Sequence, residues 1–310
     1  MTGGKLGLKG IVTATPTPVA ADGSIDVSAA TAVAEHVVAG NATGIAPVGG
    51  TGEATALTPE QRLRMLEITV EAVNGRIPVI PGILSPGIGE ALAAARDFAT
   101  AGADMLMVVT PYYARATQGG IVDYYKAISD AVDLPIMLYE IPYRTGIQLE
   151  AETTAALGRE TRVTAMKACS PDLPYQMRCV ALAGADIDIL TGEENVYPAH
   201  VAMGARGGVL ASSLLFPNAW NYLHALAAGG RNAKATAFHR RLMPYVSMLY
   251  REHNPGPLRA ALDIVGMPQG ECLPPLRPAS EETKTVLAAQ LPDAFRLEDE
   301  ARALLAEAAA

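Results

Sequence analysis

The chain has 310 residues, with 32 acidic and 24 basic side chains and a net charge of −8. This balance argues against a nucleic-acid-binding protein, which would carry a basic face. Half of the residues are hydrophobic and 18% are charged, so a disordered chain is excluded because this composition buries a large core. No apolar run reaches the roughly 18 residues of a membrane span, and residues 1–10 lack the apolar segment of a secretory signal.

Short apolar segments recur along the first two thirds of the chain. Most are continuous apolar runs, which are typical of parallel strands buried on both faces. We expect eight strands, at Gly10–Thr15, Gly44–Val48, Ile77–Gly82, Asp104–Thr110, Leu134–Tyr139, Arg162–Lys167, Asp186–Thr191 and Gly207–Ala211.

Helical patterns fill the intervals between these strands. The clearest helix begins after Thr58, which is the expected N-cap, with Pro59 in the first turn and Gln61 at capping-box spacing. It ends at the C-cap pair Asn74-Gly75. We expect the others at Val27–Ala39, Gly89–Thr100, Gly120–Ala131, Glu150–Leu157, Pro171–Leu182 and Asn195–Met203.

Eight consecutive strand–helix units predict a (β/α)8 TIM barrel over residues 1–215. A doubly wound sheet would more often have about five or six strands. Helices without strands follow, at Pro217–Ala228, Asn232–Glu252, Pro257–Val265, Ser280–Gln290 and Asp293–Ala309. Because no Gly/Ser linker precedes them, we expect residues 216–310 to form a C-terminal helical domain that packs on the barrel.

Catalytic side chains of such a barrel come from the C-terminal ends of its strands. Of the lysines in the chain, only Lys167 ends an apolar strand. Desolvation at a barrel mouth lowers a lysine pKa, and the neutral amine can then attack a carbonyl and form a Schiff base. The alternative is a lysine that reaches solvent or pairs with Glu193.

Three other residues follow predicted strands and suit the same chemistry. Tyr139 is a candidate proton shuttle if its neighbours lower its pKa, or else a core tyrosine. Thr51 lies in a Gly-rich turn, Gly49–Glu53, whose amides suit a carboxylate; this turn lacks the Walker lysine and the third glycine of a dinucleotide-binding loop. Arg144 is a candidate for a bidentate pair with a substrate carboxylate, or forms a surface salt bridge.

The sequence gives little support to metal or thiol chemistry. All five histidines fall in expected helical stretches and none ends a strand, so we expect no metal site and disfavour a metal-dependent aldolase. The three cysteines are odd in number and widely spaced. This favours a reducing, cytoplasmic compartment without a disulfide framework. Cys169 lies two residues beyond Lys167 and is interpreted as a packing residue.

At this point the residues fall into ordered motifs that resemble the dihydrodipicolinate synthase / N-acetylneuraminate lyase family of Schiff-base-forming lyases. The motifs are Gly10–Val19, Gly49-Gly-Thr-Gly-Glu53, Pro111-Tyr-Tyr113, Tyr139-Glu-Ile-Pro-Tyr-Arg-Thr-Gly146, Gly192-Glu193, Gly207-Gly-Val209 and Asn254-Pro-Gly-Pro257. Lys167 ends the strand that carries the family lysine. The resemblance covers nearly the whole chain and implies a TIM barrel and a class I lyase. It further implies that the enzyme needs neither a metal nor a cofactor beyond the covalent imine on Lys167.

The resemblance also implies roles for the reacting groups. Lys167 would form the imine with pyruvate or another 2-oxo acid. Tyr139 would shuttle protons with help from Thr51. Tyr113 would reach into the site of a neighbouring subunit, which implies a homotetramer built as a dimer of dimers.

Substrate binding is expected at the Gly-rich turn and opposite it. The amides of Gly50 and Thr51 would bind the 2-oxo acid carboxylate, and Arg144 would hold the distal carboxylate of the second substrate. The remaining expected substrate contacts are Gly192, Glu193 and Leu210. No nucleic acid or membrane partner is expected.

The departures from the family pattern concern the second substrate. Gly50 stands where the synthase has Thr or Ser, so a proton relay through two hydroxyls is incomplete; this favours sugar-acid dehydratases of the family. The motif around Arg144 favours the synthase instead. Glu140 replaces the usual Asn, and Ala168 replaces a common acidic residue.

We therefore predict a Schiff-base-forming lyase that acts on pyruvate or a sugar-derived 2-oxo acid through Lys167. One alternative is 4-hydroxy-tetrahydrodipicolinate synthase, which joins pyruvate and aspartate semialdehyde. Another alternative is a non-catalytic sensor that binds a 2-oxo acid.

Overall fold

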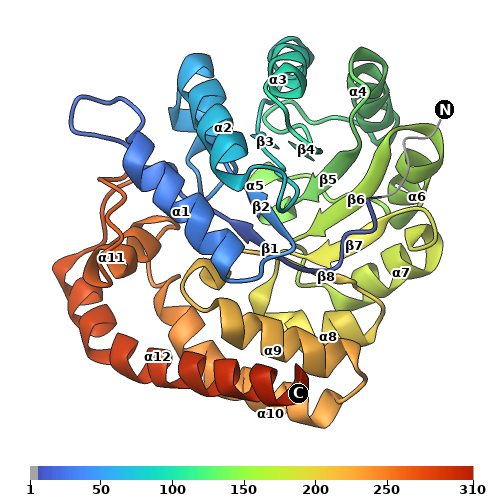
Figure 1. The fold of residues 1–310 in the computed structure, drawn as a ribbon. Coiled ribbons are helices and arrows are strands. Elements are labelled where there is room, and N and C mark those ends of the chain that lie inside the picture. The colour runs from blue at the N-terminus through green and yellow to red at the C-terminus, as the bar shows by residue number, and fades with distance from the viewer. Residues whose placement is uncertain (1–5, 310) are drawn as a thin grey trace.

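A barrel of eight parallel strands lies at the centre of the computed structural model, which describes residues 6–309 (Figure 1). The strands lie in the order β2-β1-β8-β7-β6-β5-β4-β3, and a parallel bridge from Ile45 to Val79 links the two end strands. The strands are β1 Gly10–Ala14, β2 Gly44–Ala46, β3 Gly82–Ile83, β4 Leu106–Val109, β5 Ile136–Glu140, β6 Val163–Ala168, β7 Asp188–Thr191 and β8 Gly207–Leu210. The predicted (β/α)8 barrel is confirmed.

Strand β3 is shorter and later in the chain than the sequence pattern predicts. We expected Ile77–Gly82, but the ladder covers only Gly82–Ile83 and the isolated bridge at Val79. Pro78 and Pro81 lie in this segment and have no backbone N–H to donate to a neighbouring strand. The apolar run is therefore buried in the barrel wall without forming a continuous ladder.

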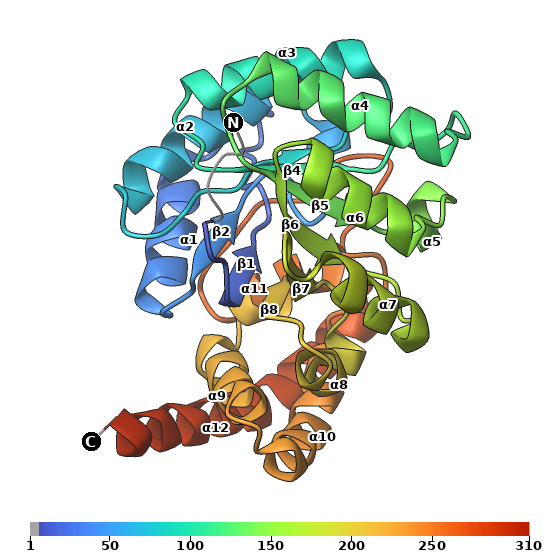
Figure 2. The same ribbon diagram turned by 90° about the vertical axis from the view of Figure 1, so that its right-hand side faces the viewer.

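Helices between the strands cover the outside of the barrel (Figures 1 and 2). They are α1 Val27–Ala39, α2 Pro59–Val73, α3 Ile88–Thr100, α4 Gln118–Ala131, α5 Pro142–Thr145, α6 Ala151–Glu160, α7 Leu173–Ala183 and α8 Tyr197–Ala202, with 3-10 turns η1 Ala54–Ala56 and η2 Glu194–Val196. The capping box of Thr58 and Gln61 is present, and Asn74 ends α2 in the left-handed conformation. The short helix α5 was not predicted.

The C-terminal helices pack along one side of the barrel, beside β1 and α8, where α12 lies across α9 and α10 (Figure 2). They are α9 Pro217–Ala228, α10 Asn232–Met248, α11 Gly256–Ile264 and α12 Glu281–Ala309, and the 3-10 turn η3 Ser212–Leu214 precedes them. Trp220 on α9 is fully buried, and its indole N–H donates to the Ser212 hydroxyl at 2.7 Å. The buried apolar residues of barrel and C-terminal helices form one continuous core.

Two predicted C-terminal helices form the single helix α12. We expected a break around Pro292, but the helix runs through it. Leu287, Leu291 and Leu297 are buried and keep helical spacing across the proline. Their burial outweighs the one backbone hydrogen bond that proline removes. Helix α10 also ends earlier than predicted, at Met248, and the chain then turns toward the barrel.

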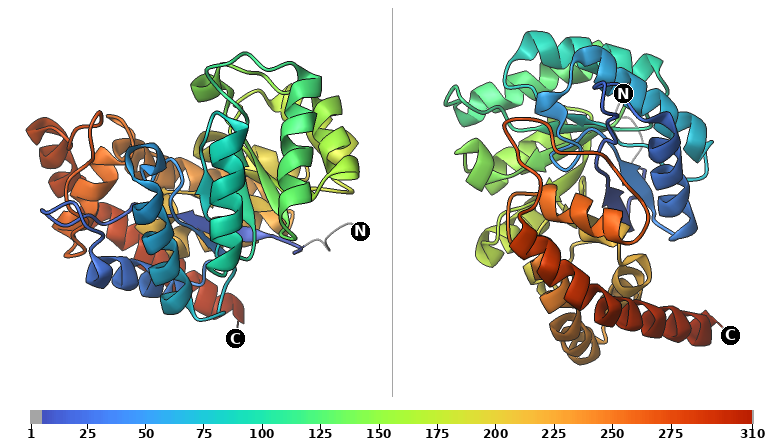
Figure 3. Two further views of the ribbon diagram at one scale, coloured as in Figure 1. Left: turned by 90° about the horizontal axis from the view of Figure 1, so that it is seen from above. Right: turned by 90° about the vertical axis from the view of Figure 1, so that its left-hand side faces the viewer.

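The segment between α11 and α12 crosses the face toward which the strands point (Figure 3, right). Its backbone is tied to the barrel, because the amide of Leu273 donates to Glu53 at 2.8 Å. The C-terminal extension thus contributes to the mouth of the barrel, where TIM barrels carry their active sites.

Candidate active site

Lys167 and Tyr139 come from neighbouring strands and meet at the C-terminal mouth of the barrel. They are paired in register between β6 and β5. The Lys167 Nζ lies 4.5 Å from the centroid of the Tyr139 ring. The structure therefore brings an amine beside a phenol at these two strand ends.

Lys167 is buried, with 8% of its surface exposed. Burial lowers its pKa from the usual 10.5, and nearby Arg144 lowers it further, whereas Cys169 and Glu194 act in the opposite direction. No salt bridge from Lys167 to Glu193 is formed. The amine therefore has the environment of a nucleophile rather than that of a solvent-exposed cation.

The environment of Tyr139 does not lower its pKa, which was the condition for its candidate role as a proton shuttle. Burial instead raises the pKa well above 10, and Arg144 only partly opposes this effect. The phenol therefore keeps its proton at neutral pH. It is suited to donating a hydrogen bond or a proton to a departing hydroxyl group, and less suited to acting as a phenolate base.

The Gly-rich turn after β2 forms the opposite side of the site. A Cβ atom on Gly50 would lie 3.4 Å from Arg144 Nη1 and 3.7 Å from the Tyr139 hydroxyl. The glycine therefore leaves open the space between these two groups. Gly52 packs closely as well, since a Cβ there would lie 2.9 Å from the Val48 backbone, so the turn is held in one shape.

Residues of the C-terminal extension hold this turn from behind. The Asn254 side-chain amide donates to the Thr51 hydroxyl at 2.9 Å. Glu53 accepts from Arg259 in a buried ion pair (Nε to Oε2 3.1 Å). The sequence motif that begins at Asn254 was recognised, but this contact with Thr51 was not predicted, because the two residues are 203 positions apart.

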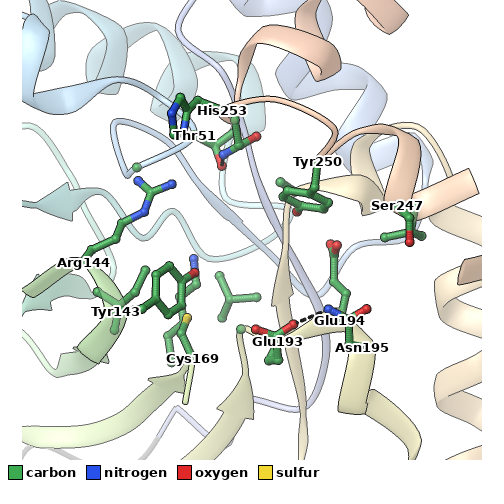
Figure 4. A pocket seen from close by; sticks show the side chains of 18 of the residues that line it. Thr51, Tyr143, Arg144, Cys169, Glu193, Glu194, Asn195, Ser247, Tyr250 and His253 are labelled. Atoms are coloured by element: carbon green, nitrogen blue, oxygen red, sulfur yellow. Dashed lines mark hydrogen bonds between the residues drawn. The ribbon is translucent and has the colours of Figure 1, made fainter. Parts of the chain in front are cut away.

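A cavity of about 480 Å³ lies above Lys167. Figure 4 shows Arg144 on one side of it, with Glu193, Glu194, Tyr250 and His253 on the others. The remaining lining residues are Gly50, Thr51, Tyr139, Ile141, Tyr143, Lys167, Cys169, Gly192, Asn195, Val209, Ala211, Met243, Val246, Ser247, Glu252 and Asn254. Most of the expected contact residues therefore line one cavity.

The acidic wall of the cavity follows β7. Glu194 is buried and its pKa is raised by desolvation, although the Ser212 hydroxyl and amide donate to it at 2.7 and 3.2 Å. Glu193 is only partly buried, and its carboxylate accepts from Asn195 at 2.8 Å. Gly192 is needed for space, because a Cβ there would lie 2.2 Å from Cys169 Sγ.

Two predicted site residues lie outside this cavity. Tyr113 is 97% exposed, with a left-handed φ of 71°, and does not line the cavity of its own chain. Leu210 is buried and does not line it either, whereas Val209 and Ala211 do. Adjacent residues of a strand point to opposite faces, so the Leu210 side chain lies away from this cavity, and a substrate contact at Leu210 stays a prediction.

Sequence reasoning missed the wall formed by Ser247, Tyr250 and His253. Helix α10 ends at Met248, so His253 belongs to a loop rather than to a helical stretch as expected. These residues carry no strand-end pattern, and no signal in the sequence indicated that they face the barrel mouth.

Neither a metal cluster nor a membrane-spanning helix is found in the described part of the chain. Within residues 6–309, no three His, Cys, Asp or Glu side chains are arranged to hold a metal ion. None of the helices described has the length and apolar character that a membrane span requires.

The model of the dihydrodipicolinate synthetase family matches residues 7–294. The chain belongs to this family. Its members are metal-independent class I lyases that form a Schiff base on a lysine, and the protein is therefore an enzyme of this class. This membership agrees with the amine and phenol found at the barrel mouth.

Curated relatives and solved structures support the same assignment. The 4-hydroxy-tetrahydrodipicolinate synthase of Gluconacetobacter diazotrophicus is 36% identical over 89% of this chain and 93% of the relative. The same enzyme of Acidiphilium cryptum is 33% identical over 91% of this chain and 97% of its own length. Dihydrodipicolinate synthase from Thermotoga maritima is 30% identical, with a TM-score of 0.90, and the match covers 93% of this chain and 99% of that structure.

Proposed function

We propose that Lys167 forms an imine with the ketone of a 2-oxo acid, with pyruvate as the first candidate. The observation that carries this proposal is a buried lysine with a lowered pKa beside Tyr139 at the base of a cavity of about 480 Å³. The neutral amine attacks the carbonyl carbon to give a carbinolamine. Loss of the hydroxyl as water then leaves the carbon–nitrogen double bond.

Tyr139 and Thr51 serve the proton transfers of this step. Because the Tyr139 phenol keeps its proton, it donates to the hydroxyl that leaves the carbinolamine, and regains a proton from the amine nitrogen as the imine forms. Asn254 donates to the Thr51 oxygen, so the Thr51 hydroxyl hydrogen is free to point into the cavity. Thr51 is therefore an oriented donor at the Gly-rich turn.

The substrate carboxylate is assigned to the Gly50 and Thr51 amides. Arg144 reaches the space that Gly50 leaves open, where it holds a distal carboxylate of the second substrate. On the acidic wall, Gly192 has no side chain, so the substrate can approach its backbone, and Glu193 accepts hydrogen bonds from the substrate.

Two classes of second substrate are supported by different observations. The named relatives are 4-hydroxy-tetrahydrodipicolinate synthases, which favours aspartate semialdehyde as the partner of pyruvate. The missing Gly50 side chain and a wall of carboxylates and hydroxyls at Glu193, Ser247 and Tyr250 favour a hydroxylated, sugar-derived 2-oxo acid. Steady-state turnover, measured with pyruvate plus aspartate semialdehyde and separately with a sugar-derived 2-oxo acid, decides between the two classes.

Tyr113 supports an assembly of several copies. It projects fully exposed from the loop after β4, and we propose that it enters the cavity of a partner subunit in a homotetramer built as a dimer of dimers. One of the similar solved structures is titled as a monomeric dihydrodipicolinate synthase variant, so the assembly must be measured for this chain. Light scattering of the wild type and of Tyr113→Ala tests it.

The proposal includes no cofactor beyond the imine on Lys167 and places the enzyme in the cytoplasm. All three cysteines are free and buried, which suits a reducing compartment.

The deciding experiment is borohydride trapping with a panel of 2-oxo acids, pyruvate included, followed by intact mass and peptide mapping. We expect a reduced adduct on Lys167, and the acid trapped most rapidly identifies the substrate class. Binding of an acid to the folded protein without an adduct would contradict the proposal and favour the non-catalytic sensor.

A further inference from the structure

Glu140, the last residue of β5, has a buried carboxyl group that the proposed mechanism does not use. Its side chain has no exposed surface. Tyr139 faces the cavity, so Glu140 points to the opposite side of the strand. There its Oε2 accepts from the backbone amides of Cys169 and Ser170, at 3.2 and 3.1 Å.

These two amides belong to the turn that directly follows β6, the strand that carries Lys167. Glu140 is paired in register with Ala168, whose small side chain leaves room for the carboxyl group to reach past it. The Cys169 amide also donates to the Glu140 carbonyl oxygen at 3.0 Å. Both the backbone and the side chain of Glu140 therefore hold the turn.

The turn also forms the back of the lysine site. The space beside Gly192 is filled by Cys169 Sγ and by Lys167 Cε, at 2.2 and 3.0 Å from the position that a Gly192 Cβ would take. A shift of the turn moves the Cys169 side chain, and with it the surface against which the lysine packs. Glu140 is thus linked to Lys167 through Cys169, whose amide it accepts from and whose thiol lies beside the lysine.

Within residues 6–309, no ion pair balances the charge of Glu140, and only the two backbone amides stabilise its ionised form. Oε1 is buried without a hydrogen-bond partner, and burial raises the pKa of Glu140 to about 7. The titratable groups that face it from β5, the end of β6 and α7 are Tyr139, Cys169, Tyr175 and Cys179. In the neutral acid, Oε1 carries the proton and Oε2 still accepts both amides. Desolvation is the main cause of the raised pKa of Tyr139, and the charge of ionised Glu140 raises it further.

We propose that Glu140 is a positioning residue for imine formation, which acts on Lys167 through the Cys169–Ser170 turn and on Tyr139 through its charge. The inference rests on the proposed function of Lys167. Glu140 touches no substrate. Its neutral form holds the turn, and its ionised form makes Tyr139 a weaker proton donor to the hydroxyl that leaves the carbinolamine.

The test is the rate of imine formation with pyruvate, or with the 2-oxo acid that traps best, between pH 5.5 and 9. Rapid quenching into borohydride and intact mass give this rate without a second substrate. Glu140→Gln keeps an acceptor of the same shape and removes the titration. We expect it to match the wild type within about twofold at pH 6 and to exceed it about fivefold at pH 8.5, because only the wild type gains a charge behind Tyr139.

Two further variants test the position of the carboxyl group. Glu140→Asn shortens the side chain, and we expect the imine rate to fall about tenfold at all pH values because the Ser170 amide loses its acceptor. The double variant Glu140→Asn/Ala168→Glu returns a carboxyl group to the same register level from the neighbouring strand. We expect it to recover part of the lost rate.

The outcomes separate this inference from the proposed function. Superimposable pH profiles for the wild type and Glu140→Gln, with normal trapping in both, overturn the effect of the Glu140 charge on Tyr139. An unchanged imine rate in Glu140→Asn overturns the role of Glu140 in holding the Cys169–Ser170 turn. Absence of an adduct in the wild type overturns the imine at Lys167 and this inference with it. If Glu140→Asn does not fold, the comparison with Glu140→Gln still decides.

Discussion

The two walls of the cavity were built in different ways. The strand wall carries Lys167 and Tyr139 at the ends of adjacent β strands, paired in register. The second wall, the loop wall, carries Tyr250, His253 and Asn254 on the loop that follows α10. The strand wall holds an amine and a phenol that suit the chemistry the family shares. The loop wall would surround the second substrate in the proposed function, and loops are where members of a family can differ.

The two walls are also held together by different forces. Backbone hydrogen bonds between neighbouring strands fix the positions of the residues in the strand wall, and a residue there cannot move without breaking some of these bonds. The loop wall depends on a few side-chain contacts, among them Asn254 with Thr51 and Arg259 with Glu53. Substitutions in the strand wall should therefore change the chemistry, while substitutions in the loop wall should change binding and stability.

The largest effect is expected on the strand wall. Lys167→Ala removes the nucleophile, and we expect turnover to fall about a thousandfold or more while the fold is kept. Steady-state kinetics and circular dichroism measure the two properties. Lys126→Ala, which removes an exposed lysine on α4, is the matched control and should be active. Full activity of Lys167→Ala would refute the imine mechanism.

The link between the walls comes next. Arg259→Met leaves the Glu53 carboxylate buried without its partner, since both side chains are almost fully buried. We expect a loss of about 3–5 kcal/mol in the free energy of unfolding, measured by urea denaturation. Arg251→Met removes an exposed ion pair with Glu282 and should cost less than about 1 kcal/mol. Equal losses would show that the buried pair does not join the walls.

A smaller effect, dependent on pH, is expected for Glu140 behind the strand wall. Its pKa rises from an ordinary value of 4.5 to about 7 in the folded protein, so its contribution is full below 4.5 and is lost as the pH rises through 7. Relative to Glu140→Gln, the wild type should lose about 3 kcal/mol of unfolding free energy between pH 4.5 and 8. Urea denaturation across this range checks it, and a constant difference would contradict the assigned ionisation.

Arg144 lies between the two walls, and its removal should separate binding from chemistry. We expect Arg144→Ala to raise KM for the second substrate about tenfold and to change imine formation with pyruvate much less. Parallel measurement of steady-state kinetics and borohydride trapping gives both values. If both fall equally, Arg144 binds the 2-oxo acid rather than the second substrate.

The smallest effect concerns the loop wall alone. Asn254→Ala removes the donor to the Thr51 hydroxyl, so this hydroxyl is no longer oriented and kcat should fall about fivefold. Asn195→Ala removes a comparable amide from the acidic wall and serves as the control, with kcat close to that of the wild type. An unchanged kcat in Asn254→Ala would show that Thr51 needs no orientation.

The features of the fold that could be predicted from the sequence depend on residues close together in the chain. The capping box of Thr58 and Gln61 and the left-handed C-cap at Asn74 depend on neighbouring residues only, and both were predicted. The apolar strand before Lys167 was predicted for the same reason. The short ladder of β3 and the continuous helix through Pro292 were not, because backbone donors and distant packing outweigh the local pattern there.

The site shows the same division. Lys167, Tyr139, Thr51, Gly50 and Arg144 were candidates because each follows a predicted strand. The direction of the Tyr139 pKa shift could not be predicted from the sequence, since desolvation depends on everything packed around the ring.

The sequence by itself determined the order of strands and helices, the caps and the residue types at the strand ends, because these follow from periodicity and nearest neighbours. Only the tertiary structure decided that Asn254 touches Thr51, that Ser247, Tyr250 and His253 face Lys167 across the cavity, and that Glu140 is buried without a cation. Contacts between residues more than 200 positions apart, and the desolvation of a buried charge, arise from packing in three dimensions, which no local pattern in the chain records.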